Sequence, residues 1–121
     1  LDVAHNPQAI ETLVDYLKQR MPGVKIHALF AMMKDKDIGT AISLMSDSIS
    51  YWYCAPLNNP RAASESMLMS FFAEKNITAV QGGYSSVAAT FEDVKRRVKP
   101  GELILVFGSF FLVSEYLANF A

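Results

Sequence analysis

The stretch that decides the fold is VKIHALFAMM, residues 24–33. Nearly all of its residues are apolar, without the alternation of a strand that has one face in solvent. Such a run is typical of a strand in a parallel sheet that is covered on both faces. Pro22-Gly23 separates it from a helical pattern before it, and Lys34-Asp35-Lys36-Asp37 follows it.

Helices and strands alternate on both sides of this stretch. The apolar spacing predicts helices over 7–21, 38–49, 60–76, 87–98 and 110–117, with caps at Asn6, Asp37, Asn59, Ser85 or Ser86, and Ser109. Strands are predicted over 1–4, 24–33, 51–55, 77–80 and 103–107. Short connections between alternating elements predict an α/β fold, a three-layer open and mainly parallel sheet with helices on both faces.

Length and composition exclude several classes of protein. The chain has 121 residues, which is one domain, and a formal charge of −1, which gives no electrostatic footprint for nucleic acid or an anionic membrane. One cysteine excludes an internal disulfide framework, and no apolar run is long enough to span a membrane. No signal peptide is visible, so a cytoplasmic location is expected. Because the first strand is only four residues long, we expect that the chain is cut from something longer or that its start is an expression boundary.

Ligands of open α/β sheets bind at the carboxyl ends of the strands. The segments predicted to lie there are Asp2–Pro7, Lys34–Asp37, Leu57–Arg61, Gln81–Tyr84 and Gly108–Ser109. Cations and helix N-termini at one edge favour an anionic ligand, such as a phosphate or a carboxylate.

Each of these segments also has a purely structural interpretation. Asp2 and the Gly82-Gly83 pair suit turns, His5 and Ser109 suit helix starts, and residues 34–37 suit a solvated loop. His27 lies within a strand and Cys54 has no nearby base, so both are interpreted as packing residues. The chain contains neither the G-x-x-x-x-G-K-[ST] phosphate loop nor a G-x-G-x-x-G fingerprint.

Four motifs together resemble one enzyme family. They are Asp2-Val-Ala-His-Asn-Pro7, Lys34-Asp-Lys-Asp37, Ala55-Pro-Leu57 with Pro60-Arg-Ala62, and Val106-Phe-Gly-Ser-Phe110. In this order and spacing they resemble the folylpolyglutamate synthases and dihydrofolate synthases, which are Mur-type ATP-dependent amide ligases. The resemblance covers the whole chain and implies that residues 1–121 are the C-terminal domain of such a ligase, with a Rossmann-like sheet.

The resemblance also implies a reaction. ATP phosphorylates a carboxylate of dihydropteroate or a folate, and the amine of L-glutamate attacks the resulting acyl phosphate. The phosphate loop, most of the folate contacts and the Mg²⁺ site would lie in a preceding N-terminal ATPase domain of the same polypeptide. The isolated chain would therefore be inactive, with no catalytic residue or metal ligand of its own.

Roles follow from the motif positions. Asp2 would contact ATP, His5 would lie on the glutamate side of the cleft, and Lys34 would pair with a glutamate carboxylate. Ser109 would bind another carboxylate at the start of the last helix, and Arg61 would contact the same anion.

Other functions remain open at this point. A peptidoglycan-precursor ligase of the same superfamily carries D-N-P-R where this chain has Asn58-Asn59-Pro60-Arg61, so the missing carboxylate favours the folate enzymes. A receiver domain needs an Asp at the end of its third strand, where this chain has Ala55-Pro56-Leu57-Asn58. A non-catalytic α/β binding module is the remaining alternative. Whether the parent enzyme adds the first glutamate, extends a glutamate tail or does both stays undecided.

Overall fold

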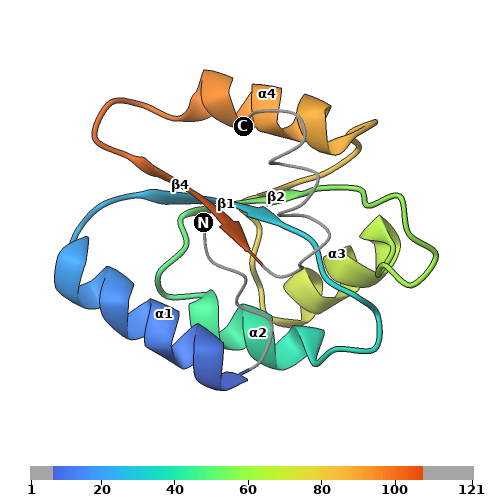
Figure 1. Ribbon diagram of the computed structural model, residues 1–121, viewed down its shortest axis with the longest axis horizontal. Helices are drawn as coiled ribbons and strands as arrows, with labels where there is room; N and C mark the ends of the chain where they lie inside the picture. The colour runs from blue at the N-terminus through green and yellow to red at the C-terminus, as the bar shows by residue number, and fades with distance from the viewer. Residues whose placement is uncertain (1–6, 108–121) are drawn as a thin grey trace.

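The computed structural model describes residues 7–107, which form a parallel sheet between two layers of helices (Figure 1). The elements in chain order are α1 (Pro7–Arg20), β1 (Ile26–Phe30), α2 (Ile38–Met45), β2 (Tyr51–Cys54), α3 (Glu65–Glu74), β3 (Val80–Gln81), α4 (Val87–Arg97) and β4 (Leu103–Phe107). The strand order is β3-β2-β1-β4, and all three pairings are parallel. The predicted α/β class, with a parallel sheet and helices on both faces, is confirmed.

Strand β1 lies in the middle of the sheet because it is apolar on both of its faces. All five of its residues are buried. Ile26, Ala28 and Phe30 contribute to the core beneath α1, α2 and α3, whereas Leu29 contributes to a second core beneath α4. The alternation of β-strand side chains therefore supplies both cores from one strand.

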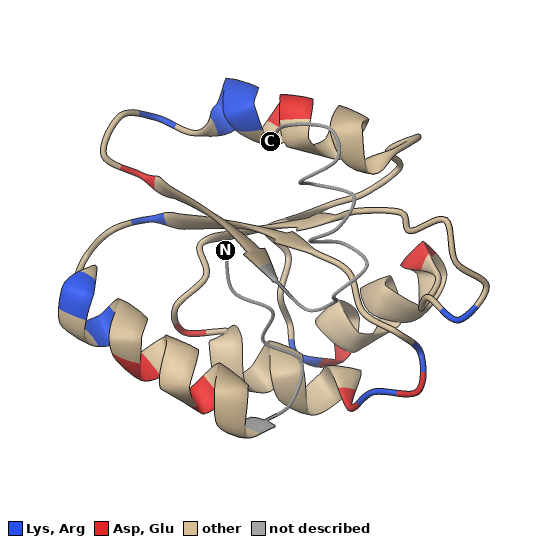
Figure 2. Cartoon of the chain, viewed as in Figure 1, with Lys and Arg blue, Asp and Glu red and all other residues tan. Residues whose placement is uncertain are grey.

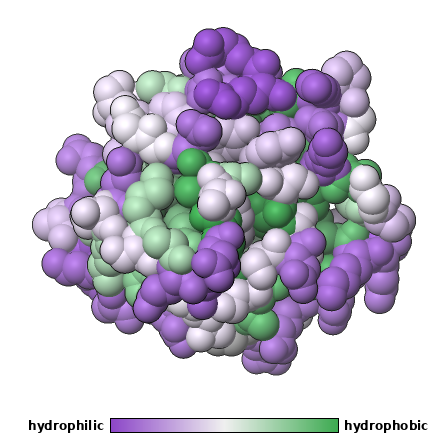
Figure 3. Space-filling view, turned by 180° about the vertical axis from the view of Figure 1, so that it is seen from behind, coloured by the Kyte–Doolittle hydropathy of each residue, from purple (hydrophilic) through white to green (hydrophobic). Residues whose placement is uncertain are grey.

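Three helices cover one face of the sheet and α4 covers the other (Figure 1). The larger core is built around an aromatic cluster, in which the Trp52 ring meets Phe30 and Phe72 edge to face at centroid distances of 5.4 and 5.0 Å. Seen from behind, the upper edge with α4 is strongly hydrophilic, and apolar residues gather lower on this face (Figure 3). The sheet is thus buried on both sides, as parallel sheets generally are.

Helix α3 begins later than the sequence pattern indicated. The predicted start at Asn59-Pro60 is wrong, because Ser64 is the N-cap and accepts a hydrogen bond from the Met67 N–H at 3.1 Å. Asn59 instead closes a turn, in which its side-chain oxygen accepts from the Arg61 N–H at 2.8 Å. Asn side chains stabilise turns and helix caps by the same kind of bond, so the sequence pattern does not separate the two.

Smaller differences concern the ends of elements. The strand predicted over 24–33 is confined to 26–30, the helix predicted over 38–49 ends at Met45, and the strand predicted over 77–80 is the pair Val80–Gln81. Of the two candidate caps for α4, Ser86 takes the role and accepts from the Ala89 N–H at 3.0 Å. The predicted strand over 1–4 and the predicted helix after Gly108-Ser109 lie outside the described residues.

Over residues 7–107, no helix combines the length and the apolar character that crossing a bilayer requires.

Candidate functional site

The loops that follow β1, β2 and β3 lie at one edge of the sheet, because the three strands are parallel. These loops are residues 31–37, 55–64 and 82–86. Figure 2 shows alternating positive and negative residues along the loop after β1, which contains Lys34-Asp35-Lys36-Asp37. The edge at which the sequence predicts ligand binding therefore carries a charged loop.

Backbone hydrogen bonds join the first two of these loops. The Lys34 N–H donates to the Arg61 carbonyl at 2.8 Å, the Ala63 N–H donates to the Met32 carbonyl at 2.9 Å, and an antiparallel bridge pairs Met33 with Ala62. Lys34 and Arg61, which are 27 positions apart, are brought side by side. Two of the residues predicted to bind the same anionic ligand thus lie on two hydrogen-bonded segments, residues 32–34 and 61–63, which we call the platform.

The two cations of this platform differ in their partners. The Arg61 guanidinium contacts the Asp35 carboxylate at 3.1 Å, and both side chains are more than half exposed. An ion pair so exposed contributes about 0–1 kcal/mol to stability. Lys34 is exposed and makes no ion pair with any residue that the structure describes.

Asp37, the last residue of the charged loop, has a structural role. Its carboxylate accepts hydrogen bonds from the Thr40 hydroxyl at 2.7 Å and from the Thr40 N–H at 3.2 Å. These bonds hold the pKa of Asp37 below its usual range, and they cap α2. The predicted cap is confirmed, and Asp37 is a support for the loop rather than a ligand contact.

A small hollow of about 160 Å³ opens at the carboxyl end of β2. Its lining includes Cys54, Pro56, Asn59, Ser64 and Glu65. Burial, followed by the negative charge of Glu65, raises the pKa of the Cys54 thiol to about 12. The thiol is therefore neutral and buried, as the sequence indicated, and it is no nucleophile.

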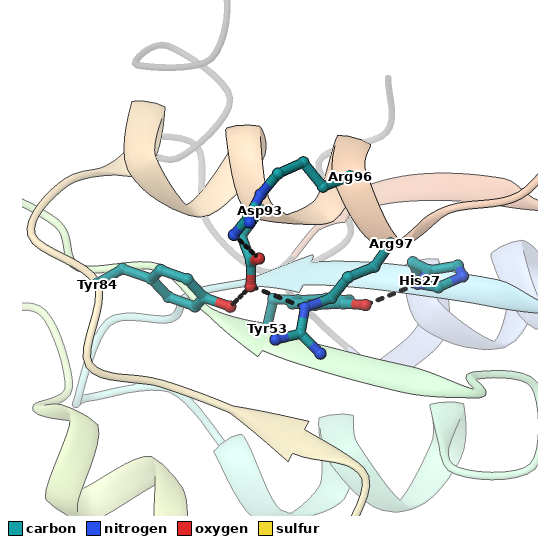
Figure 4. Close-up of polar contacts among 6 residues, drawn as sticks. All are labelled: His27, Tyr53, Tyr84, Asp93, Arg96 and Arg97. Atoms are coloured by element: carbon teal, nitrogen blue, oxygen red, sulfur yellow. Dashed lines mark hydrogen bonds and ion pairs between the residues drawn. The ribbon is translucent and has the colours of Figure 1, made fainter.

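The glycine loop after β3 is anchored at two consecutive residues. The Gly83 N–H donates to the Glu65 carboxylate at the start of α3, and the Tyr84 hydroxyl donates to the Asp93 carboxylate in α4. The same carboxylate accepts from Arg97 at 3.0 Å and from Arg96 (Figure 4). Helices on both faces of the sheet therefore hold this loop in place.

Asp93 is the buried charge of this network. The Tyr84 hydrogen bond, together with Arg97 and Arg96, holds the pKa of Asp93 below its usual range, whereas burial and the bond to Asp93 raise the pKa of Tyr84. Sequence reasoning missed Glu65 and Asp93, and it placed Tyr84 at the ligand edge without its contacts. The spacing of Asp93 with Arg96 and Arg97, at i+3 and i+4 of one helix, was a signal for part of the network.

The described residues do not make a metal site. Within residues 7–107 no three His, Cys, Asp or Glu side chains gather closely enough to hold an ion. Asp2, His5 and Ser109, which the sequence placed at the ligand edge, lie outside the described residues. Of the predicted site residues, the structure therefore places Lys34 and Arg61.

Comparison with known proteins identifies relatives along the whole chain. A family model described as Mur ligase, glutamate ligase domain, matches residues 1–110. The dihydrofolate synthase/folylpolyglutamate synthases of Buchnera aphidicola subsp. Schizaphis graminum and of Escherichia coli K12 are each 31% identical to it, over 98% and 96% of the chain. The chain spans only 27% and 26% of the length of these two relatives.

Solved structures of synthases of the same kind also resemble this chain in fold. A ligand-free bifunctional folylpolyglutamate synthase/dihydrofolate synthase from Yersinia pestis superimposes with a TM-score of 0.86 at 33% identity, covering 98% of this chain and 28% of that one. E. coli FolC in complex with DHPP and ADP gives a TM-score of 0.86 at 30% identity, with 98% and 27% covered. A bifunctional synthase of the same kind with Mn, AMPPNP and L-glutamate bound gives 0.86 at 34% identity, with 98% and 28% covered.

Proposed function

Since this chain belongs to the Mur ligase family of glutamate ligase domains, we propose that it is the C-terminal domain of an ATP-dependent ligase that adds L-glutamate to dihydropteroate, to folates or to both. The observation that carries the proposal is the platform that joins Lys34 to Arg61 at the carboxyl edge of the sheet. A cationic platform at this edge suits a substrate with two carboxylates, such as glutamate.

Lys34 is the glutamate contact that this proposal makes central. Its backbone is fixed by the bond to Arg61, four residues after the end of β1, while its side chain is exposed. Arg61 would contact the same glutamate anion. On the motif positions, His5 and Ser109 would complete the glutamate site and Asp2 would contact ATP; these three roles rest on the sequence alone.

The rest of the site would come from a larger N-terminal ATPase domain of the same polypeptide. When bound, ATP supplies the phosphoryl group that activates the substrate carboxylate. We assign the metal and the triphosphate mainly to that domain, because the resemblance implies that the phosphate loop lies there. The role of the C-terminal domain, which is this chain, would be to bind and orient glutamate as it closes on the nucleotide.

We also propose a cytoplasmic location. The only cysteine, Cys54, is buried as a free thiol, which fits a reducing compartment.

Substituting Lys34 with alanine in the full-length ligase tests the proposal. A charge-assisted contact contributes about 1.5–3 kcal/mol, or about 10- to 150-fold in binding. Steady-state kinetics of Lys34→Ala should therefore show a KM for glutamate raised at least tenfold, with a much smaller change in the KM for ATP.

Lys36→Ala is the matched control. Lys36 carries the same charge in the same exposed loop, two positions further from the Arg61 backbone contact. It should leave both KM values nearly unchanged. Equal small effects at Lys34 and Lys36 would show that the loop is merely solvated.

A further inference from the structure

A second hollow lies at the opposite edge of the sheet, at the amino ends of the strands and on the α4 face. It measures about 220 Å³, and its lining comprises Lys25, His27, Tyr51, Tyr53, Arg97, Lys99 and Glu102. His27 is the second residue of β1, Tyr51 is the first of β2, and Glu102 directly precedes β4. The hollow is therefore separate from the loops that carry Lys34 and Arg61.

A chain of buried polar groups forms the floor. The His27 ring bonds Tyr53 through Nδ1 and Glu102 through Nε2, each at 2.8 Å. A carboxylate only accepts, so Nε2 carries a proton and donates to Glu102. In a neutral ring Nδ1 then accepts from the Tyr53 hydroxyl, whose pKa burial raises. Both ring nitrogens of His27 thus have hydrogen-bond partners within the protein, and neither is left to bind a ligand.

Glu102 is also occupied by the protein itself. Besides His27, its carboxylate accepts from the Lys99 N–H at 3.0 Å, and these bonds lower the pKa of Glu102. Its side chain is only 16% exposed. The one carboxylate in the lining therefore points into the fold rather than toward an incoming ligand.

Three cations surround the opening. Arg97 uses its Nε on Asp93 at 3.0 Å, and Figure 4 shows its two terminal nitrogens pointing away from that carboxylate. Lys25 and Lys99 are exposed and form no ion pair among the described residues. Tyr51 makes a wall, with its ring stacked on His27 at 4.7 Å and 39% of its surface exposed.

We propose that this hollow binds a phosphate-type oxyanion. A guanidinium end and two ammonium groups over one small hollow present donors from several directions, which suits a tetrahedral dianion. Glu102 stays ionised, so the lining holds three cations against one carboxylate, and an excess of positive charge remains at the hollow. This proposal does not rest on the proposed ligase function, since it concerns binding at the other edge of the sheet.

Titration of the full-length protein with inorganic phosphate tests the site. The titration is followed by calorimetry in the presence of a saturating non-hydrolysable ATP analogue, which keeps any nucleotide site filled. The double variant Lys25→Ala/Lys99→Ala should bind phosphate at least tenfold more weakly than the unaltered protein. Arg97 is left in place because its bond to Asp93 supports the fold.

The matched control is Lys18→Ala/Lys75→Ala, which removes the same charge from α1 and from the end of α3. It should change phosphate affinity less than twofold. Equal weakening in the two double variants, or no saturable phosphate binding in the unaltered protein, overturns the proposal. Glutarate serves as a second probe, and binding of glutarate more tightly than phosphate overturns the assignment to a phosphate-type anion.

Discussion

Removing the Tyr84 hydroxyl should destabilise the fold by an amount that can be worked out from its contacts. The hydroxyl donates to the buried carboxylate of Asp93, and a hydrogen bond to a charged group contributes about 1.5–3 kcal/mol. After the change, Asp93 still accepts hydrogen bonds from Arg96 and Arg97, so the expected loss lies at the lower end of this range. Tyr84→Phe is therefore expected to lower the free energy of unfolding by about 1.5–2 kcal/mol, or 10- to 30-fold in the unfolding equilibrium.

Urea denaturation of the 121-residue chain at neutral pH measures this loss. Tyr16→Phe is the control, because Tyr16 is 53% exposed and should cost no more than about 0.5 kcal/mol. In an Asp93→Asn background, the effect of Tyr84→Phe should shrink by at least half, since the charged acceptor is gone. Equal losses at Tyr84 and Tyr16, or full additivity with Asp93→Asn, would refute the network as a source of stability.

Three further outcomes are expected. Asp93 and Glu102 have pKa values below those of the unfolded chain, so the stability they add is present above about pH 5 and is lost as the pH falls; urea midpoints should drop in acid, with a flatter slope for Asp93→Asn. Gly82→Ala should cost about 0.5–1.5 kcal/mol in the same assay, because its Cβ, 2.7 Å from the Glu65 carboxyl carbon, displaces this flexible carboxylate from the Gly83 N–H, whereas Gly39→Ala, at 3.4 Å from the Phe71 ring, should be nearly neutral. The chain alone should melt cooperatively yet release no phosphate from ATP in the presence of glutamate, and glutamate-dependent release would contradict the assignment of the phosphate loop to another domain.

Much of the fold follows from sequence patterns that are local. The apolar run around Phe30 and the helical spacing of α1 and α4 predict elements that the structure confirms, because burial on both faces leaves a strong periodic signal. The start of α3 was predicted wrongly because Asn59 suits a turn as well as a cap. Which use prevails depends on the bridge between Met33 and Ala62, a contact between distant segments.

Only the part of the candidate site that depends on local sequence patterns was predicted. Lys34 and Arg61 lie in the loops that follow β1 and β2, and the position of such loops can be inferred from sequence. The contacts that fix the glycine loop, through Glu65 and Asp93, join residues on opposite faces of the sheet. No local sequence pattern predicts contacts between such distant residues, so they can be identified only from the three-dimensional structure.

The exposed pair of Arg61 and Asp35 bears on how the proposed glutamate site would work. Both side chains are more than half exposed, so their attraction is worth about 0–1 kcal/mol, less than Arg61 could gain from a ligand carboxylate in a partly closed cleft. A glutamate carboxylate can therefore displace Asp35 at small cost, while Lys34 has no described partner to give up. Until that exchange, Asp35 keeps Arg61 directed toward the loop of Lys34, which orients the guanidinium before the ligand arrives. On this reasoning Asp35→Ala should leave the fold almost unchanged and alter the KM for glutamate less than Lys34→Ala does.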